Sequence, residues 1–388
     1  MHPIVEVTID GQPVAGAFYE RLISLSVTDK EGISSDAFQA ELNDGSPDFL
    51  ALPRTGAIAD VRLGYRETGV SSVGQFTVDK VSGKCLPYGL SISGKSANLS
   101  QGKLKENKER HWDKKTLSDI IGEIAGESGL AAAVDNQVGS HQYQWMAQQD
   151  ESDIHFLERL ARRHNALFSI KDGRLIFAQR GSGLSSGGSS VGTVVITPAI
   201  IIQGTCTFEA NDRTKYSKVV AYHQDKDKAE RVEVEAEASA EGDSVFRIAE
   251  PFADIAEADK AAQAKAKQLK RGEGAAGVTV IGDTSIIAGA PLMFAGVRPG
   301  LDGIPYVIDE VTHEYSKSGF TTKITGKLYD GSSAGGGGKS GGSSDGVVNA
   351  ASGGTDKVAP DSPAGTPATP SAWVNNFPRR NSGSTDAN

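Results

Sequence analysis

The chain has 388 residues, a net charge of −9 and a hydrophobic content of 38%, which is ordinary for a folded protein of two or three domains and excludes collagen and wholesale disorder. No apolar run approaches the roughly 18 residues of a membrane-spanning helix, so we expect no membrane span. The excess of acidic residues argues against phosphate neutralisation as the main role, so no sequence-specific nucleic acid binding is expected.

The first hundred residues have the period-two pattern of short β-strands. Apolar residues alternate with polar ones in Val5-Val7-Ile9, Ile23-Leu25-Val27, Phe38-Ala40-Leu42, Ala57-Ala59-Val61-Leu63, Phe76-Val78 and Tyr88-Leu90-Ile92. Some six strands that are each apolar on one face suggest a small barrel. We therefore predict a first β-barrel domain over residues 1 to 104.

The period changes over residues 105 to 181, which predict a small α+β domain. Leu117, Ile120, Ile121 and Ile124 recur at helical spacing behind Thr116 and Asp119, a pattern that resembles a capping box. A second helix is expected from the acidic stretch at Asp150 to Asp153. Lys171-Asp172-Gly173-Arg174 then predicts a tight hairpin.

A Gly/Ser-rich linker at residues 182 to 192 separates this domain from a second β-rich stretch. Residues 193 to 330 predict a second β-barrel domain with one alanine-rich helix at about residues 254 to 271, which Gly272 ends. Expected strands include 194 to 202, 219 to 222, 231 to 236, 278 to 281, 291 to 295, 306 to 308, 311 to 315 and 321 to 328. The predicted fold class is mainly β with an α+β insertion.

Residues 331 to 388 are rich in glycine, serine and proline and poor in large apolar residues, which predicts a flexible tail. Trp373, Phe377, Arg379 and Arg380 lie close together near its end. Two aromatic and two basic residues on a long tether suit a partner-docking peptide, and a solvated terminus is the alternative.

The sequence contains no constellation that indicates an enzyme, a metal site or a cofactor. The histidines are scattered, and no phosphate-binding glycine loop or zinc-ligand spacing is present. Cys85 and Cys206 stand far apart, and we expect buried free thiols. Catalytic, cofactor-binding and metal residues are therefore all predicted as none.

Several segments in one order resemble the late control protein D family of contractile-tailed phages. They are 112–121 (WDKKTLSDII), 148–161 (QQDESDIHFLERLA), 172–175 (DGRL), 256–271, 278–289 and 303–313 (GIPYVIDEVTH). The resemblance covers about residues 1 to 330.

The resemblance implies a structural baseplate hub, similar to the central hub of T-even phages and to the N-terminal hub part of type VI secretion spike proteins. It implies a homotrimer of pseudo-sixfold symmetry that joins the hexameric tail tube, or a tube-initiator protein, to a separate trimeric spike. Other baseplate proteins and the tape-measure protein are further expected partners. The protein is then a virion component, assembled in the host cytoplasm, and not an enzyme.

Three alternatives stay open at this point. The chain is a baseplate-associated cell-wall hydrolase, a glycan-binding tail-tip protein, or the hub of a phage-derived bacteriocin or secretion device. The absence of a carboxylate pair or a Cys/His constellation disfavours the hydrolase.

Overall fold

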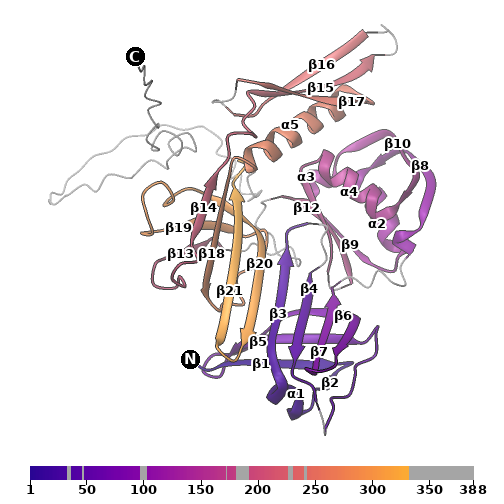
Figure 1. Cartoon of the computed structure of the whole chain (residues 1–388). Coiled ribbons are helices and arrows are strands. Elements are labelled where there is room, and N and C mark those ends of the chain that lie inside the picture. Colours follow the sequence, from indigo (N-terminus) through magenta and orange to yellow (C-terminus); the bar gives the residue numbers. More distant parts are fainter. Residues whose placement is uncertain are drawn as a thin grey trace, which may run out of the picture.

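The computed structural model describes residues 1–32, 36–45, 48–96, 103–171, 173–180, 192–225, 230–239 and 243–331. Within these ranges the protein is mainly β, as predicted, with four sheets and few helices. Figure 1 shows four parts: a first β unit at the bottom, a second β unit at the left, an α+β unit at the right and an upper lobe at the top.

The first β unit contains seven strands and one short helix. They are β1 (Pro3–Ile9), β2 (Gln12–Pro13), α1 (Gly16–Arg21), β3 (Leu22–Lys30), β4 (Ala37–Leu42), β5 (Ile58–Tyr65), β6 (Gly69–Lys84) and β7 (Gly89–Lys95). The strands pair antiparallel in the order β3-β4-β7-β6-β5-β1-β2. The predicted alternating residues form or pack on its core, with two exceptions: Tyr88, which is exposed in the turn before β7, and Ile23. Ile23 is exposed because the register between β3 and β4 shifts at Leu22 and Ser24, which turns its side chain outward.

The second β unit follows the predicted strands less closely. It contains β13 (Val194–Ile196), β14 (Thr207–Ala210), β18 (Gly274–Ile281), β19 (Pro291–Phe294), β20 (Tyr306–Ser316) and β21 (Gly319–Leu328). The strand predicted over residues 194 to 202 ends at Ile196, and the two strands predicted at 306 to 308 and 311 to 315 are one strand with a register shift at Ile308 and Glu310.

The strands of this second β unit follow one another around a closed circuit. β19 pairs with β20, β20 with β21 and β21 with β18. Residues 194 to 202 complete the circuit, since β13 pairs with β19 and Ile201 bridges to Val280 in β18. The core inside contains Phe294, Leu301 and Tyr306.

The α+β unit lies between the two β units in the sequence. It contains β8 (Asn107–Thr116), α2 (Leu117–Glu127), β9 (Ala131–Val134), α3 (Asn136–Gly139), β10 (Gln142–Ser152), α4 (Asp153–Arg163), β11 (Ala166–Lys171) and β12 (Arg174–Gln179). The predicted capping box is confirmed, because the Thr116 hydroxyl accepts the Asp119 N–H at 3.1 Å and the Asp119 carboxylate accepts the Thr116 N–H at 3.0 Å. The predicted hairpin is also confirmed by the pairing of Lys171 with Arg174.

The upper lobe is a separate sheet with one helix. Its strands are β15 (Lys218–Asp225), β16 (Glu230–Glu237) and β17 (Val245–Phe252). β15 pairs with β16 on one side and β17 on the other, and the three pair with no other described strand. The predicted helix is α5 (Ile255–Arg271), whose N-cap Asp254 accepts the Glu257 N–H at 2.8 Å and whose C-cap is Gly272. Its alanines pack against Val219, Ala221 and Phe252 of the sheet.

Cys85 is exposed, which corrects the expected burial, because it lies in the turn between β6 and β7; Cys206 is half-buried. Burial raises the pKa of the Cys206 thiol. In the described part of the chain, no helix has the length and apolar character to span a membrane.

Candidate functional site

The most distinctive feature of the molecule is a seam at which the two β units become one sheet. β3 of the first β unit pairs antiparallel with β20 of the second, from Lys30 opposite Glu310 to Ser24 opposite Ser316. The Lys30 Nζ lies 2.9 Å from Glu310 Oε2, and the hydroxyls of Thr28 and Thr312 are 3.3 Å apart. The result is a single sheet of 13 strands, whose central strands run side by side in Figure 1.

The hydrophobic cores of the two β units also interlock at this seam. Phe320 stands on β21 of the second β unit but packs in the core of the first, with its ring 5.6 Å from that of Tyr65. The Tyr65 hydroxyl donates a hydrogen bond to the Gly282 carbonyl at 3.1 Å. Burial, and secondarily the negative charge of Asp283, raise the pKa of Tyr65. The two units therefore share both backbone and side-chain contacts.

A buried ion pair connects the seam to the upper lobe. Arg271 ends α5, and its Nη2 donates to Glu31 Oε2 at 2.7 Å, just beyond the end of β3. Arg180, which follows β12 of the α+β unit, places its Nη1 4.0 Å from the same oxygen. Glu31 is thus the point where three of the four parts meet.

Further polar contacts fix α5 against the α+β unit. Arg163 at the end of α4 pairs with the buried Glu257 at the start of α5. Close to this contact, the Tyr143 hydroxyl and His164 Nε2 are 2.6 Å apart. Burial, and secondarily the neighbouring His141, lower the pKa of His164 to about 3. The imidazole of His164 is therefore neutral at pH 7.

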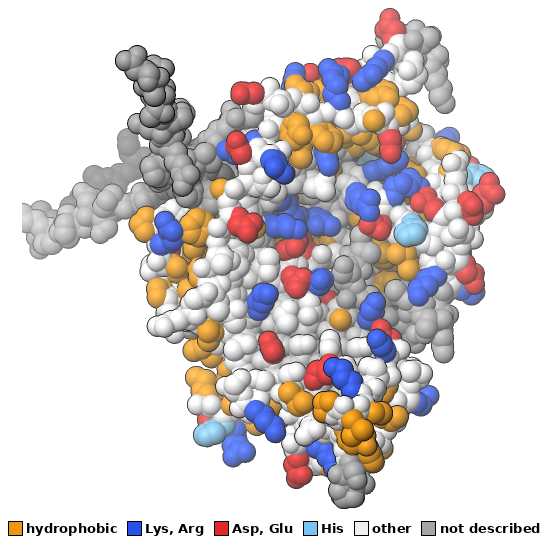
Figure 2. All heavy atoms as spheres, in the orientation of Figure 1, with side chains coloured by type: hydrophobic (Ala, Val, Ile, Leu, Met, Phe, Trp, Pro, Cys, Tyr) orange, Lys and Arg blue, Asp and Glu red, His pale blue; other side chains and the backbone are white. Residues whose placement is uncertain are grey.

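The outer face of the seam is polar along its whole width. One row of cross-strand neighbours runs Thr321, Glu314, Ser26, Gln39 and Ser93 across five strands. A parallel row runs Thr279, Lys323, Thr312, Thr28, Ala37 and Lys95. These two rows contain no aromatic residue, and in Figure 2 the central area is mostly white with scattered charges. We call this surface the polar sheet face.

Two groups of exposed apolar side chains flank the polar sheet face, and one member, Ile281, is the direct cross-strand neighbour of Thr321 in its first row. The first, which we call the loop patch, comprises Phe49, Leu52, Leu86 and Tyr88, which are between 38% and 80% exposed. The second, which we call the wall patch, comprises Val195, Ile202, Ile281 and Met293, which are between 36% and 49% exposed. Figure 2 shows hydrophobic atoms at the lower right, over the tip of the first β unit, and along the left flank, over the second.

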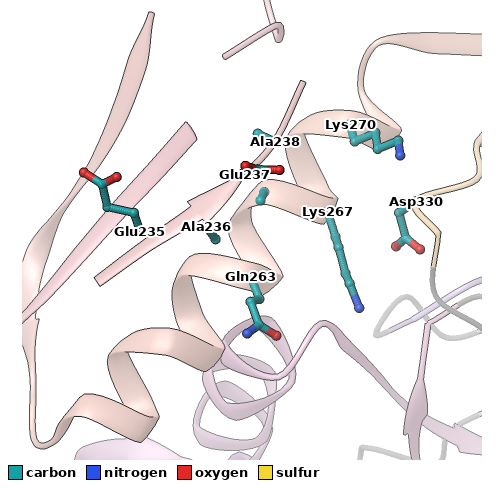
Figure 3. Close-up of a pocket in the computed structure, with 9 residues that line it drawn as sticks. Glu235, Ala236, Glu237, Ala238, Gln263, Lys267, Lys270 and Asp330 are labelled. Atoms are coloured by element: carbon teal, nitrogen blue, oxygen red, sulfur yellow. The ribbon is translucent and has the colours of Figure 1, made fainter. Parts of the chain in front are cut away.

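A groove beside α5 is the larger of two hollows found among the residues that the structure describes. A groove of about 320 Å³ lies between β16 and α5, and Figure 3 shows Lys267, Lys270 and Asp330 at one end of it, Glu235 at the other and Glu237 between them. Charged side chains of both signs line it together with Gln263 and three alanines. Among the residues that the structure describes, no group of three His, Cys, Asp or Glu side chains is placed to hold a metal ion.

The residues that sequence reasoning selected as a docking peptide, Trp373, Phe377, Arg379 and Arg380, lie outside the described residues. The features that sequence reasoning missed are the seam and the two apolar patches. Period-two alternation identifies strands but not their partners, so no local signal pointed to β3 and β20 as neighbours.

Comparisons with known proteins agree with this architecture. Two curated relatives, each described as "Probable baseplate hub protein", come from Escherichia phages 186 and P2. They are 28% and 29% identical to this chain over 83% of it and 92% of their own lengths. The 43 kDa tail protein of prophage MuSo2 from Shewanella oneidensis has a similar fold, with a TM-score of 0.66 at 16% identity, over 84% of this chain and 99% of that one.

The family model described as phage tail baseplate hub (GPD) matches residues 30–319. This range includes the whole of β20, the whole α+β unit and the upper lobe. The chain therefore belongs to the phage tail baseplate hub (GPD) family.

Proposed function

We propose that the protein is the hub of a phage tail baseplate, and that three copies form a ring of pseudo-sixfold symmetry. The observation that carries this proposal is the seam, because it holds two β units side by side in one chain. Three such chains present six β units around one axis, so a trimer matches a hexameric partner without a symmetry mismatch. In this proposal the two β units are the tube-like barrel domains expected from the sequence.

The partners follow from this symmetry. One side of the ring contacts the hexameric tail tube or a tube-initiator protein, and the other contacts a separate trimeric spike. The α+β unit and the upper lobe lie outside the seam and are available to other baseplate proteins. The protein then resides in the virion, after assembly in the host cytoplasm.

In the ring, the polar sheet face is oriented toward the central lumen. Supporting this orientation, the face crosses both β units without interruption and carries hydroxyl and charged side chains but no aromatic ones in its two rows. A surface of this kind stays hydrated and offers few adhesive contacts to a passing chain. We propose a structural and non-enzymatic role, since the groove beside α5 contains no set of groups suited to catalysis.

The test is particle averaging by electron microscopy of the full chain co-expressed with the spike encoded beside it. A ring with three-fold symmetry and six lobes around a lumen is the expected result. Isolated two-lobed monomers without an attached spike would contradict the proposal. Clearing of a cell-wall layer by the purified chain would instead favour a hydrolase, and binding to a glycan array would favour a tip adhesin.

We also propose that residues Trp373 to Arg380 dock on a neighbouring subunit, on the spike or on the tape-measure protein. This part of the proposal rests on the aromatic and basic residues of an otherwise Gly/Ser-rich segment. The test is deletion of residues 331 to 388. Loss of one partner from the complex supports docking, and unchanged assembly dismisses it.

A further inference from the structure

A second hollow, of about 160 Å³, lies where the upper lobe packs on the α+β unit, and we call it the junction hollow. One wall comes from α3, the C-terminal end of α4 and β12, and the other comes from α5. The lining side chains that can donate a hydrogen bond into it include Gln137, His164, Gln179, Lys260, Gln263 and Lys267. Contacts between two parts of a chain are frequent places for ligand sites.

The junction hollow carries positive charge without a matching negative charge. Lys260 and Lys267 line it, and no aspartate or glutamate does so among the residues that the structure describes. Neither lysine forms an ion pair with a carboxylate in the described part of the chain. Lys267 is also half-buried, so its side chain has given up part of its contact with water without gaining a counter-charge. An anion in the hollow would supply that charge.

The charged wall is one face of α5. Positions 260, 263 and 267 are three and four residues apart, so their side chains follow one another over two turns, about 10 Å along the helix axis. Figure 3 shows Gln263 and Lys267 extending to the same side of this helix. Since lysine side chains are long and flexible, Lys260 and Lys267 can converge on one ligand that lies over Gln263.

The opposite wall supplies amide groups whose backbone is fixed. The Asp135 carboxylate accepts the Gln137 N–H at 2.9 Å with one oxygen and the Gln179 N–H at 3.4 Å with the other. One side chain thus holds both glutamines in place, and both of its oxygens are engaged within the α+β unit. The side-chain amides of Gln137 and Gln179 remain able to donate to an anion.

His164 contributes a neutral donor. Burial, and to smaller extents His141, Lys260 and Arg163, lower its pKa to about 3, so the imidazole is neutral at pH 7. Burial raises the pKa of Tyr143, so its hydroxyl keeps its proton and donates it to His164 Nε2, 2.6 Å away. The imidazole proton then resides on Nδ1, which has no hydrogen bond to another described residue.

We propose that the junction hollow binds a doubly charged oxyanion of the phosphate class. The two ammonium groups match the charge of this ion, and the amides and the His164 N–H surround it with neutral donors. A volume of about 160 Å³ holds such an ion together with several waters. The bound ion contacts α5 on one side and α3 and β12 on the other, so it joins the upper lobe to the α+β unit.

The experiment titrates inorganic phosphate into the full chain by isothermal titration calorimetry, with chloride holding the ionic strength constant. We expect saturable binding of one phosphate per chain. The variant that combines Lys260→Gln with Lys267→Gln should weaken binding by about 100-fold, because each charge-assisted hydrogen bond contributes roughly tenfold. Lys260→Gln alone, at an exposed position, should weaken it by about tenfold and serves if the double variant does not fold.

Lys270→Gln is the matched control. Lys270 is on the same helix and is half-buried like Lys267, but it lines the larger groove with Asp330 and Glu237 and not the junction hollow. We expect this variant to bind phosphate as the wild type does. Circular dichroism verifies that each variant is folded.

Hydrogen exchange measures whether the ion joins the two parts. Phosphate should slow exchange of the amides in α3 and β12 in the wild type and in Lys270→Gln, and leave them unchanged in the double variant, because a ligand stabilises the folded segments that it contacts.

The site is overturned if the wild type binds no phosphate, if the double variant binds it as tightly as the wild type, or if Lys270→Gln loses as much affinity as the double variant. Binding that leaves exchange in α3 and β12 unchanged overturns the connection between the two parts. None of these results depends on the number of copies in the ring, so the site and the proposed hub are tested separately.

Discussion

Glu31 and Arg271 form a buried ion pair between positions 240 residues apart in the sequence. The side chains are 1% and 6% exposed, and the nitrogen and oxygen are 2.7 Å apart. Glu31 follows β3 and Arg271 ends α5, so the pair connects the upper lobe to the seam. A charge in such a place is tolerated only while its partner is present.

Replacing Arg271 with methionine should destabilise the protein by about 3 kcal/mol, because it leaves the Glu31 carboxylate buried without its closest cation. Chemical denaturation of the full chain measures the loss. Lys30→Ala is the matched control, since Lys30 is close by and pairs with Glu310 at an exposed site. It should cost under about 1 kcal/mol. Equal losses for the two variants would show that burial of the pair is unimportant.

Gly282→Ala should destabilise the seam by about 1 to 3 kcal/mol through overpacking. A Cβ at this position would lie 2.3 Å from two ring atoms of Phe320, so the ring must leave its place in the core of the first β unit. The same substitution at Gly122, on the exposed side of α2 with open space around it, should stabilise by up to about 1 kcal/mol through helix propensity. Urea unfolding measures the change in the free energy of unfolding for both variants. A change of the same sign in both would contradict the packing argument.

Stability should fall as the pH is lowered from 7 toward 5, in part because of His164. Burial lowers the pKa of this imidazole to about 3 in the folded state, whereas an unfolded histidine titrates near 6.5. Between these two pKa values the unfolded state binds more protons than the folded state. The contribution of His164 to the free energy of unfolding is therefore complete above pH 6.5, and below that pH it is lost at up to about 1.4 kcal/mol per pH unit.

The variant His164→Gln should flatten this pH dependence. Tyr143→Phe is the control, because it removes the hydrogen bond to His164 but leaves the ring buried. It should cost about 1 kcal/mol at every pH and preserve the slope. Denaturant midpoints at several pH values between 5 and 7 measure both effects. If the pH dependence of stability disappears in Tyr143→Phe, the hydrogen bond and not burial lowers the pKa of His164.

Thr116→Ala should cost about 1 kcal/mol, because it removes the side-chain acceptor for the Asp119 N–H at the first turn of α2. Thr116→Ser keeps a hydroxyl in the same place and should retain most of the stability. Hydrogen exchange of the α2 amides measures the effect locally. Unchanged protection in Thr116→Ala would show that packing of Leu117 and Ile120 alone fixes this end of the helix.

Helix starts and tight turns were predictable from the sequence, because interactions between residues close together in the chain determine them. The helices α2, α4 and α5 follow the N-caps Thr116, Ser152 and Asp254, whose side chains all accept a hydrogen bond from the first turn. The acidic stretch placed the start of α4 three residues too early, because Asp150 to Ser152 still belong to β10. The turn between β11 and β12 likewise follows from its own residues. Capping and turn chemistry act within a few residues, so they can be read directly from the sequence.

The arrangement of strands was not predictable in the same way. Thr28 and Thr312 are neighbours across the seam although 284 residues separate them, and nothing in either strand specifies the other. The same holds for β15 to β17, whose alternation resembles that of the strands around them but which form a sheet of their own against α5. The partner of a strand depends on long-range packing, and this also hid the two apolar patches.

The seam joins a strand that is translated early to one that is translated late. β3 leaves the ribosome early, but its partner β20 and the Phe320 side chain that completes the first core are translated near the end. At bacterial rates of about 5 to 20 residues per second, the edge of β3 waits roughly 15 to 60 s for its neighbour. A product that terminates before β20 therefore lacks both the strand that pairs with β3 and the Phe320 side chain of the first core, so the seam forms only in a chain translated through β21.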